Sequence, residues 1–281
     1  MVNGYHTEDA DGSSVASSVT QNAAVTAARL VIVAALLTVA APAAAQRPRR
    51  RFEPTDLRLQ PAGVAEVDLQ GGVVTGEDGQ RAFVPDFEAS LGISSHVELE
   101  LDGTFGLDQL SKPMFLDNTL LAVRIGIVDE PDAPGSTSSW SGGVQAGPRL
   151  PTLPQTRGLG LEALAIVGRT AGGMHLFAQF GSLIDPAEPV AGYRRPVHPF
   201  GIEGGFDLDL DLDQHDTWSL SAELGGIKYF SPHRDQIHVA AGPALRVSKG
   251  LELSLVGLVG ILSGGDRLGV FVGANTRFDV F

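Results

Sequence analysis

Cysteine is absent from this 281-residue chain, which excludes disulfides, thiolate metal sites, cysteine nucleophiles and lipid attachment through an N-terminal cysteine. Positive charge is scarce as well, because 20 lysines and arginines stand against 33 aspartates and glutamates, giving a formal net charge of −13 at pH 7. Proteins that bind nucleic acid do so mainly through cationic side chains that neutralise phosphates. We therefore expect no nucleic-acid partner.

Glycine and proline are plentiful, with 35 and 17 residues, and 43% of the residues are hydrophobic. This composition excludes wholesale disorder and suits many strands joined by turns. The clearest pattern begins at Phe206. From there the apolar and acidic residues alternate as Phe206, Asp207, Leu208, Asp209, Leu210, Asp211, Leu212 and Asp213. Only a strand puts these two sets on separate faces, and the alternation resumes over residues 218–224, so we predict a long antiparallel hairpin.

The apolar face of this hairpin needs a dry environment, and the acidic face needs water or cations. A soluble sandwich would bury the apolar face against a second sheet, whereas an outer-membrane barrel would turn it to lipid and enclose the acids in a wet lumen. The rest of the chain decides between them. Alternating runs cover residues 64–73, 82–93, 97–105, 119–127, 140–150, 159–168, 174–184, 197–212, 217–229, 237–247, 251–261 and 268–278.

Most of these runs are about ten residues long, enough to cross a bilayer when tilted, and longer than a sandwich needs. Lysine is nearly missing from them, although the solvent face of a sandwich would carry many. Tight gaps alternate with longer polar ones, as in bacterial barrels, except for the long gap at residues 129–138. The run over residues 161–167 departs from the pattern because it is apolar on both faces.

Aromatic residues make up only 6% of the chain, but several fall near the ends of the runs, where a barrel carries its aromatic girdles. We place Trp140, Trp218 and Phe278 at one rim and Phe83, Phe105, Phe200 and Phe230 at the other. The sequence thus predicts an all-β fold, a transmembrane antiparallel up-and-down β-barrel of about 12 strands over residues 63–281. We expect it in the outer membrane of a Gram-negative bacterium, in contact with outer-membrane lipid. A secreted soluble β protein is the alternative.

The N-terminal 46 residues have the layout of a secretory signal peptide behind a long acidic extension. An apolar run over residues 30–41 precedes Ala43-Ala44-Ala45 and Gln46, an arrangement typical of a cleavage site, and the run is short for a spanning helix. Residues 47–62 then form a leader on the periplasmic side, with no alternation. Its arginines are Arg47, Arg49, Arg50, Arg51 and Arg58. They either fold into the acidic lumen as a plug or gate, or belong to a disordered tail.

Parity along the strands predicts which charged residues line the pore. The predicted set is Glu66, Asp68, Asp86, Glu88, Glu98, Glu100, Asp102, Arg124, Arg149, Glu203, Asp207, Asp209, Asp211, Glu223, Arg246 and Glu252, and we add Lys228 to the same face. These charges either pair into an internal network that closes the bore, or surround a water-filled path. Because rings of acids repel anions, such a path would prefer cations or neutral solutes.

No catalytic constellation stands out, and we expect no enzymatic activity, no metal and no cofactor. Carboxylates at alternate strand positions lie in a line about 6.5 Å apart, whereas a calcium loop needs converging oxygens. The histidines show no ligand spacing, and no helical pattern follows the signal to carry a phosphate loop. Barrel enzymes that modify lipids use serine with histidine near the outer rim. Ser182 and Ser231 with His198 and His233 keep that alternative open.

Four short motifs carry a resemblance to a known family. Residues 84–99 read VPDFEASLGISSHVEL, and they are followed by Asp117-Asn118-Thr119, by residues 147–152 (GPRLPT) and by residues 272–278 (VGANTRF). This series resembles the outer-membrane transporters of the "MetA pathway of phenol degradation" family. The resemblance implies an outer-membrane barrel, a channel or passive transporter for small, apolar or aromatic solutes, and it supplies no catalytic residues. A closed structural barrel without a pore is the rival within the same fold.

Outer-membrane barrels usually end on an aromatic residue in register with the lipid-facing set, which the barrel-assembly machinery reads. Here Phe278 is in register with Val270 and Val272, while Phe281 is the last residue of the chain. Either phenylalanine fits the role of the assembly signal.

Overall fold

The structure is a computed structural model that describes residues 59–281 except 77–78, 108–114, 117–118, 130–137, 154, 191, 214–216, 232, 234 and 263–266. The predicted signal segment and the leader arginines, Arg58 included, therefore lie outside the described residues. Within the described part there is no helix long and apolar enough to cross a membrane.

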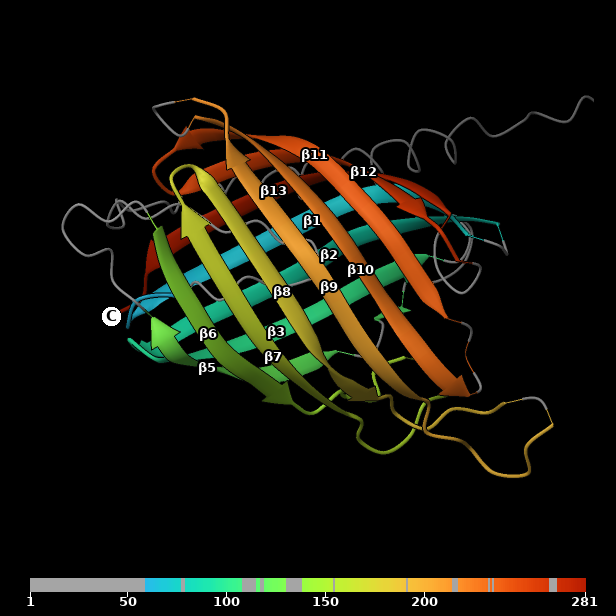
Figure 1. Ribbon diagram of the computed structural model, residues 1–281. Helices are drawn as coiled ribbons and strands as arrows, with labels where there is room; N and C mark the ends of the chain where they lie inside the picture. The colour runs from blue at the N-terminus through green and yellow to red at the C-terminus, as the bar shows by residue number, and fades with distance from the viewer. Residues whose placement is uncertain are drawn as a thin grey trace, which may run out of the picture. The chain divides into compact units, whose positions relative to one another are not determined.

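The described residues form thirteen strands, all in one antiparallel sheet (Figure 1). The strands are β1 (Val64–Gly76), β2 (Gly79–Ser94), β3 (Val97–Leu107), β4 (Phe115–Leu116), β5 (Leu120–Asp129), β6 (Ser138–Gly147), β7 (Leu161–Ala171), β8 (Met174–Ile184), β9 (Phe200–Asp211), β10 (Trp218–Ser231), β11 (Gln236–Ser248), β12 (Leu251–Gly260) and β13 (Leu268–Asp279).

The sheet closes on itself because β1 pairs with β13 along its length, from Val64 opposite Asp279 to Thr75 opposite Leu268. The short β4 and the longer β5 both pair with β3 and share one place in the ring. The barrel therefore has twelve strand positions, as the alternation predicted. β4 lies in a segment expected to be loop, and the hairpin between β1 and β2 is tighter than expected.

The two ends of the barrel differ in their connections. At one end, here called the terminal end, β1 begins and β13 finishes, and tight turns at residues 95–96, 172–173 and 249–250 join neighbouring strands. The opposite end, the loop end, carries the long connections 148–160 and 185–199, the second of which projects at the lower right of Figure 1. This asymmetry follows the sequence prediction and is typical of bacterial barrels, whose short turns are periplasmic.

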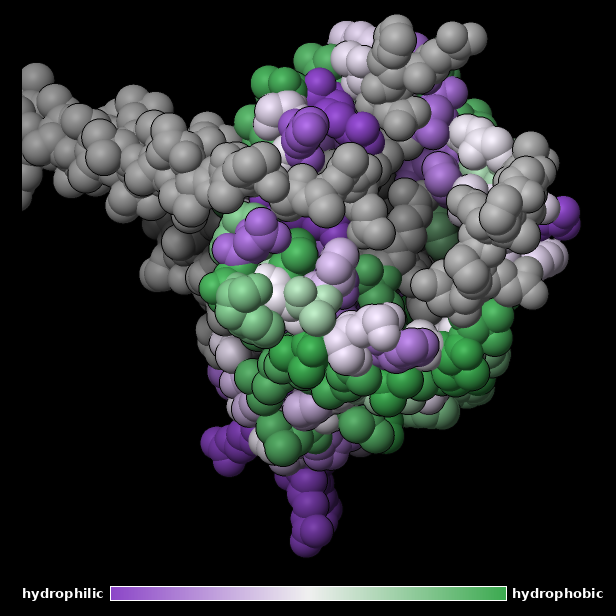
Figure 2. All heavy atoms as spheres, turned by 90° about the vertical axis from the view of Figure 1, so that its left-hand side faces the viewer, coloured by the Kyte–Doolittle hydropathy of each residue, from purple (hydrophilic) through white to green (hydrophobic). Residues whose placement is uncertain are grey.

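Exposure is inverted relative to a soluble protein. Large apolar side chains such as Phe206 and Val272 are 57% and 61% exposed on the outside, while Glu98 on the inside is fully buried. Figure 2 shows hydrophobic residues spread over the outer surface of the barrel. Because all described strands belong to this one closed sheet, lipid is the environment that can cover such a face. The chain is a membrane-spanning β-barrel, the class found in outer membranes.

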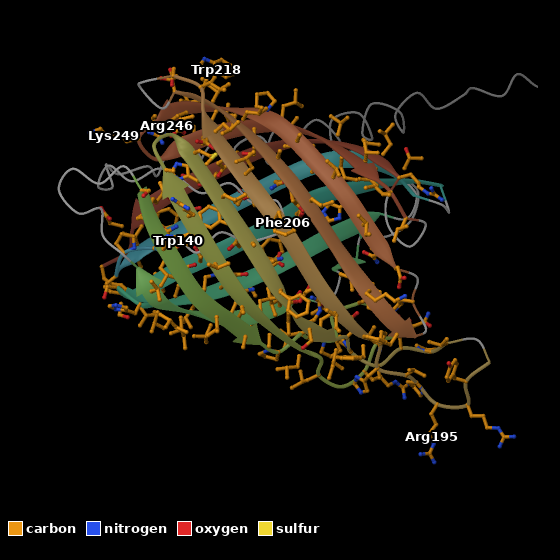
Figure 3. All side chains as sticks on the ribbon, viewed as in Figure 1. Trp140, Arg195, Phe206, Trp218, Arg246 and Lys249 are labelled. Carbon is orange, nitrogen blue, oxygen red and sulfur yellow. The ribbon has the colours of Figure 1, made fainter. Side chains whose placement is uncertain are left out.

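Aromatic residues lie at both rims. Trp140 and Trp218 are at the terminal end, in β6 and β10, and about half of each side chain is exposed (Figure 3). At the loop end the rings of Phe200 and Phe230 stack with centroids 5.3 Å apart. This placement follows the predicted girdles, whereas the side chains of Phe83 and Phe105 lie outside the described ones.

A charge on the outer face of a membrane barrel is costly in proportion to its depth, so we predict a graded response to arginine. Leu255 lies midway along β12 and is 50% exposed, while Leu212 lies just beyond the end of β9. Leu255→Arg should lower the free energy of unfolding by about 2–4 kcal/mol and Leu212→Arg by about 0–1 kcal/mol. Urea titration of the barrel in lipid vesicles measures both. Equal losses at the two positions would mean that this face does not meet lipid.

Candidate functional site

The inner wall of the barrel holds all the charged residues of the predicted pore-lining set, each buried or half-buried. Nine of them are buried, namely Glu66, Asp68, Glu98, Glu100, Arg124, Asp207, Asp209, Glu223 and Glu252. Their role in a conducting pore stays a prediction. Lys228 was placed wrongly, because parity counted from Glu223 puts it on the other face. Its side chain is 64% exposed and its ammonium lies 2.5 Å from Asp235 at the loop end.

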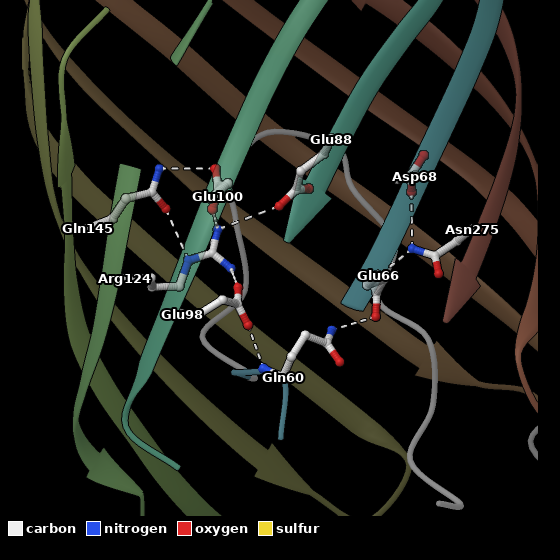
Figure 4. A network of polar contacts seen from close by, with 9 residues as sticks. All are labelled: Gln60, Glu66, Asp68, Glu88, Glu98, Glu100, Arg124, Gln145 and Asn275. Atoms are coloured by element: carbon white, nitrogen blue, oxygen red, sulfur yellow. Dashed lines mark hydrogen bonds and ion pairs between the residues drawn. The ribbon is translucent and has the colours of Figure 1, made fainter. Parts of the chain in front are cut away.

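The most elaborate part of the wall is centred on Arg124 of β5, which is fully buried (Figure 4). Register explains the contacts, because Glu98 on β3 and Gln145 on β6 are its direct cross-strand neighbours. The Arg124 Nη1 atom donates to Glu98 Oε1 at 2.9 Å, and Nε donates to Gln145 Oε1 at 3.1 Å. The remaining nitrogen, Nη2, bonds Glu100 and lies 3.9 Å from Glu88.

This arrangement uses the planar fork of the guanidinium, whose five N–H groups can serve several carboxylates at once. Two carboxylates accept hydrogen bonds from Arg124, and a third lies beside it, so acids outnumber the cation at the cluster. Gln145 Nε2 adds a further bond to Glu100 Oε1 at 3.4 Å. Buried charges are tolerated only when paired and hydrogen-bonded, and Arg124 is therefore essential to the local stability of the wall.

A second part of the network lies on β1 and β13. Asn275 Nδ2 donates to Glu66 Oε1 at 2.8 Å and to Asp68 Oδ2 at 3.3 Å. Gln60, which precedes β1, joins the two parts, since its backbone N–H donates to Glu98 and its Nε2 atom donates to Glu66 Oε2 at 2.5 Å. Figure 4 shows the chain of contacts running from Gln145 to Asn275.

Sequence reasoning followed charge and therefore missed the neutral amides. Gln145 and Asn275 occupy inward positions of β6 and β13, so the same parity would have found them. Gln60 lies in the leader, where no alternation exists to place it.

A separate cluster at the loop end is centred on Arg149. Its Nη1 atom bonds Glu162 at 2.5 Å and its Nε atom lies 2.9 Å from Asp185 Oδ1. The Tyr229 hydroxyl donates to the other oxygen of Asp185 at 3.1 Å. Glu162, Asp185 and Tyr229 were not predicted. These contacts tie together the connections that follow β6 and β8.

The wall between β8 and β11 is acidic and hydrogen-bonded. The Ser221 hydroxyl bonds Asp209, and His238 Nε2 lies 2.6 Å from Glu223 Oε1. His175 Nε2 lies 3.6 Å from Asp211 Oδ2. Two acids of the row that alternates in the sequence, Asp209 and Asp211, thus lie against the side chains of Ser221 and His175.

An apolar patch interrupts the polar wall on β7 and β8. Leu164 and Ile166 face inward, which explains the run that is apolar on both faces. Phe177 and Leu183 on β8 are also buried. Gly168 makes room for the aromatic ring, because a Cβ atom there would lie 2.4 Å from Phe177. The inner wall therefore carries buried apolar side chains on β7 and β8 in addition to its carboxylates.

The described residues do not gather into a metal site. Among them no group of three or more His, Asp and Glu side chains could hold a metal ion. His198 Nδ1 bonds the backbone oxygen of Asp185, and His233 Nε2 lies 3.2 Å from Glu188. Ser182 occupies an outward position of β8 between the inward-facing Gly181 and Leu183. Neither of these contacts involves Ser182, and the side chain of Ser231 lies outside the described ones.

We predict that removing the positive charge of Arg124 destabilises the barrel far more than removing an exposed arginine. Arg124→Met leaves buried carboxylates without their partner and should lower the free energy of unfolding by about 3–5 kcal/mol. Arg169→Met is the matched control. The Arg169 guanidinium lies 5.0 Å from the centre of the Trp140 ring at the rim, a contact worth about 0.5–1 kcal/mol.

Urea titration in detergent micelles measures both variants. Adding Glu98→Gln and Glu100→Gln to Arg124→Met should restore much of the loss, because neutral amides need no cation. A loss for Arg124→Met no larger than that for the control would contradict the structural importance of the cluster.

Comparison with known proteins supports the architecture. No protein-family model matches the chain, and no curated protein matches it. Among solved structures the chain is similar to the NanC porin, with a TM-score of 0.54 and 7% identity over 76% of this chain and 99% of that one. It also matches a porin refined at 1.8 Å resolution (TM-score 0.42, 8% identity, 76% of this chain and 100% of that one). A third match is the translocator domain of the autotransporter NalP from Neisseria meningitidis (TM-score 0.38, 13% identity, 79% and 91%). The likeness to the NanC porin shows the fold, that of an outer-membrane β-barrel.

Proposed function

We propose that this chain is an outer-membrane channel, a passive transporter of small solutes that works without chemical change to them. One observation carries the proposal: the closed barrel turns its apolar face outward and encloses a wall rich in carboxylates. A soluble protein does not need an enclosed wall of carboxylates, whereas a channel needs polar groups along its path to replace the water around a solute.

The charge of the wall indicates which solutes pass. The buried acids of the inner face include Asp207, Asp209 and Glu223, and they outnumber the inward arginines. Acids repel anions, so cations and neutral solutes are the preferred cargo. The apolar patch of Leu164 and Phe177 and the resemblance to the "MetA pathway of phenol degradation" family support solutes with an apolar or aromatic part.

The rival function is that of a closed barrel with a structural role. Arg124 and Glu98 are fully buried, which favours a tightly filled terminal end. Electrical recording separates the two functions directly, because a closed barrel carries no current.

Membrane insertion requires partners, and we propose that the barrel-assembly machinery reads the last strand. Phe278 lies within β13, opposite Ala65 of β1, whereas Phe281 lies beyond the strand and is 80% exposed. Both remain candidates for the aromatic signal.

We predict that the purified barrel, placed in a planar bilayer with a potassium chloride gradient, conducts and selects potassium over chloride. Asp207→Asn with Asp209→Asn should move the permeability ratio toward one, because two carboxylates leave the path. Asp235→Asn is the control and should leave the ratio unchanged, since Asp235 pairs with the exposed Lys228 at the rim. An absence of current from correctly folded barrel would sink the channel function, and anion selectivity would sink the assigned role of the acids.

A further inference from the structure

The residues just before β1 turn back into the barrel instead of leaving it. We call residues 59–62 the strap. The turn is made at Gly63, whose φ of +81° is a backbone conformation that favours glycine, and the Val64 N–H donates to Pro61 O at 3.0 Å. Gln60 is only 1% exposed. The strap therefore lies against the inner wall at the terminal end.

Two glycines shape the wall to receive the strap. A Cβ atom at Gly92 of β2 would lie 2.1 Å from Pro61 O and 2.3 Å from Gln60 O. A Cβ atom at Gly126 of β5 would lie 2.9 Å from Leu59 Cδ1. A side chain at Gly92 would collide with the strap backbone, so the path of the strap over β2 depends on glycine there, whereas at Gly126 only the tip of the Leu59 side chain would have to shift.

The strap is held by charged groups of the wall. Gln60 is its anchor, with hydrogen bonds to Glu98 on β3 and Glu66 on β1. The carboxylates of Glu66 and Glu98 accept these hydrogen bonds of Gln60, whereas the pairing of β1 with β2 and of β2 with β3 involves residues outside the strap. Displacing the strap would therefore leave the strand ladder intact.

We propose that the strap is the constriction of the channel, a selectivity element supplied by the chain itself. It covers the Arg124 cluster at the terminal end and narrows the path there with a neutral amide set among acids. This inference rests on the proposed channel function and adds to it the residues that set the width of the path. Gln60 is a positioning residue that fixes the strap to Glu66 and Glu98.

Two substitutions that loosen the strap test the proposal. Gln60→Ala removes the side-chain anchor, and Gly92→Ala places a methyl group against the strap backbone. Both should raise the single-channel conductance and admit larger polyethylene glycols than the unsubstituted barrel does. Gly257→Ala is the matched control, since a Cβ atom there meets only Ala241 O at an ordinary 3.9 Å, and its conductance should not change.

A disulfide tests whether the position of the strap sets the conductance. The chain has no cysteine, so engineered thiols can pair only with each other. The Cβ position at Gly126 lies 3.8 Å from Leu59 Cγ, so Leu59→Cys with Gly126→Cys brings two thiols within reach. In the Gln60→Ala background, the oxidised pair should return the conductance to that of the unsubstituted barrel, and reduction should raise it again. Heat-dependent gel mobility verifies that each variant has folded.

The outcomes distinguish the strap proposal from the channel function on which it rests. Conductance that rises on release and falls on oxidation supports the strap as the constriction. Equal conductance in all conducting variants would overturn the strap and leave the channel. Folded barrels that carry no current in any variant, released or locked, would overturn the channel and the strap together.

Discussion

The closure of the sheet between β1 and β13 is the constraint on which the rest of this structure depends. In lipid no water satisfies a free backbone N–H or C=O group, so a sheet can span the membrane only when its first and last strands pair. The pairing from Val64–Asp279 to Thr75–Leu268 meets that requirement. Once the ring is closed, every residue of a strand faces either hydrocarbon or the enclosed space, and the period of two in the sequence becomes an outside and an inside.

The enclosed space then creates its own electrostatic problem. Twelve strand positions bring many inward carboxylates close together, away from bulk water, and buried charge is costly unless it is paired. The barrel meets this cost with few cations, each of which pairs with more than one carboxylate. Arg124 serves Glu98 and Glu100 at one end, and Arg149 serves Glu162 and Asp185 at the other. Between β9 and β10, Asp209 accepts instead from a neutral donor, the Ser221 hydroxyl.

The fold could be predicted from the sequence because each strand residue faces either the lipid or the lumen. The two environments alternate from one residue to the next along the chain, so a local pattern reports them. The partners within the lumen could not, since they depend on register between strands far apart in the chain. Glu66 meets Asn275 across 209 positions, which no local pattern reports. Glu162 is the lone charged residue of the run over residues 161–167, which is otherwise apolar on both faces, and Gln60 precedes the first alternating residue. Each was missed because the signal used for prediction was periodic charge.

The leader, residues 47–62, is another part of the chain whose contacts no periodic pattern could predict, and these contacts bear on function. Its arginines, which we predicted to form a plug or gate or to belong to a disordered tail, lie outside the described residues, and among the described ones Gln60, a neutral amide, bonds the acids of the lumen. A glutamine suits this position because its side-chain amide donates to Glu66 and its backbone N–H to Glu98 without fixing a full charge in the path. The bonds of Gln60 to Glu66 and Glu98 lie outside the strand ladder, so the width of the narrow point can change without cost to the closure between β1 and β13. The width of such a constriction is set by the short segment before β1. The wall behind that segment then contributes only to the stability of the barrel.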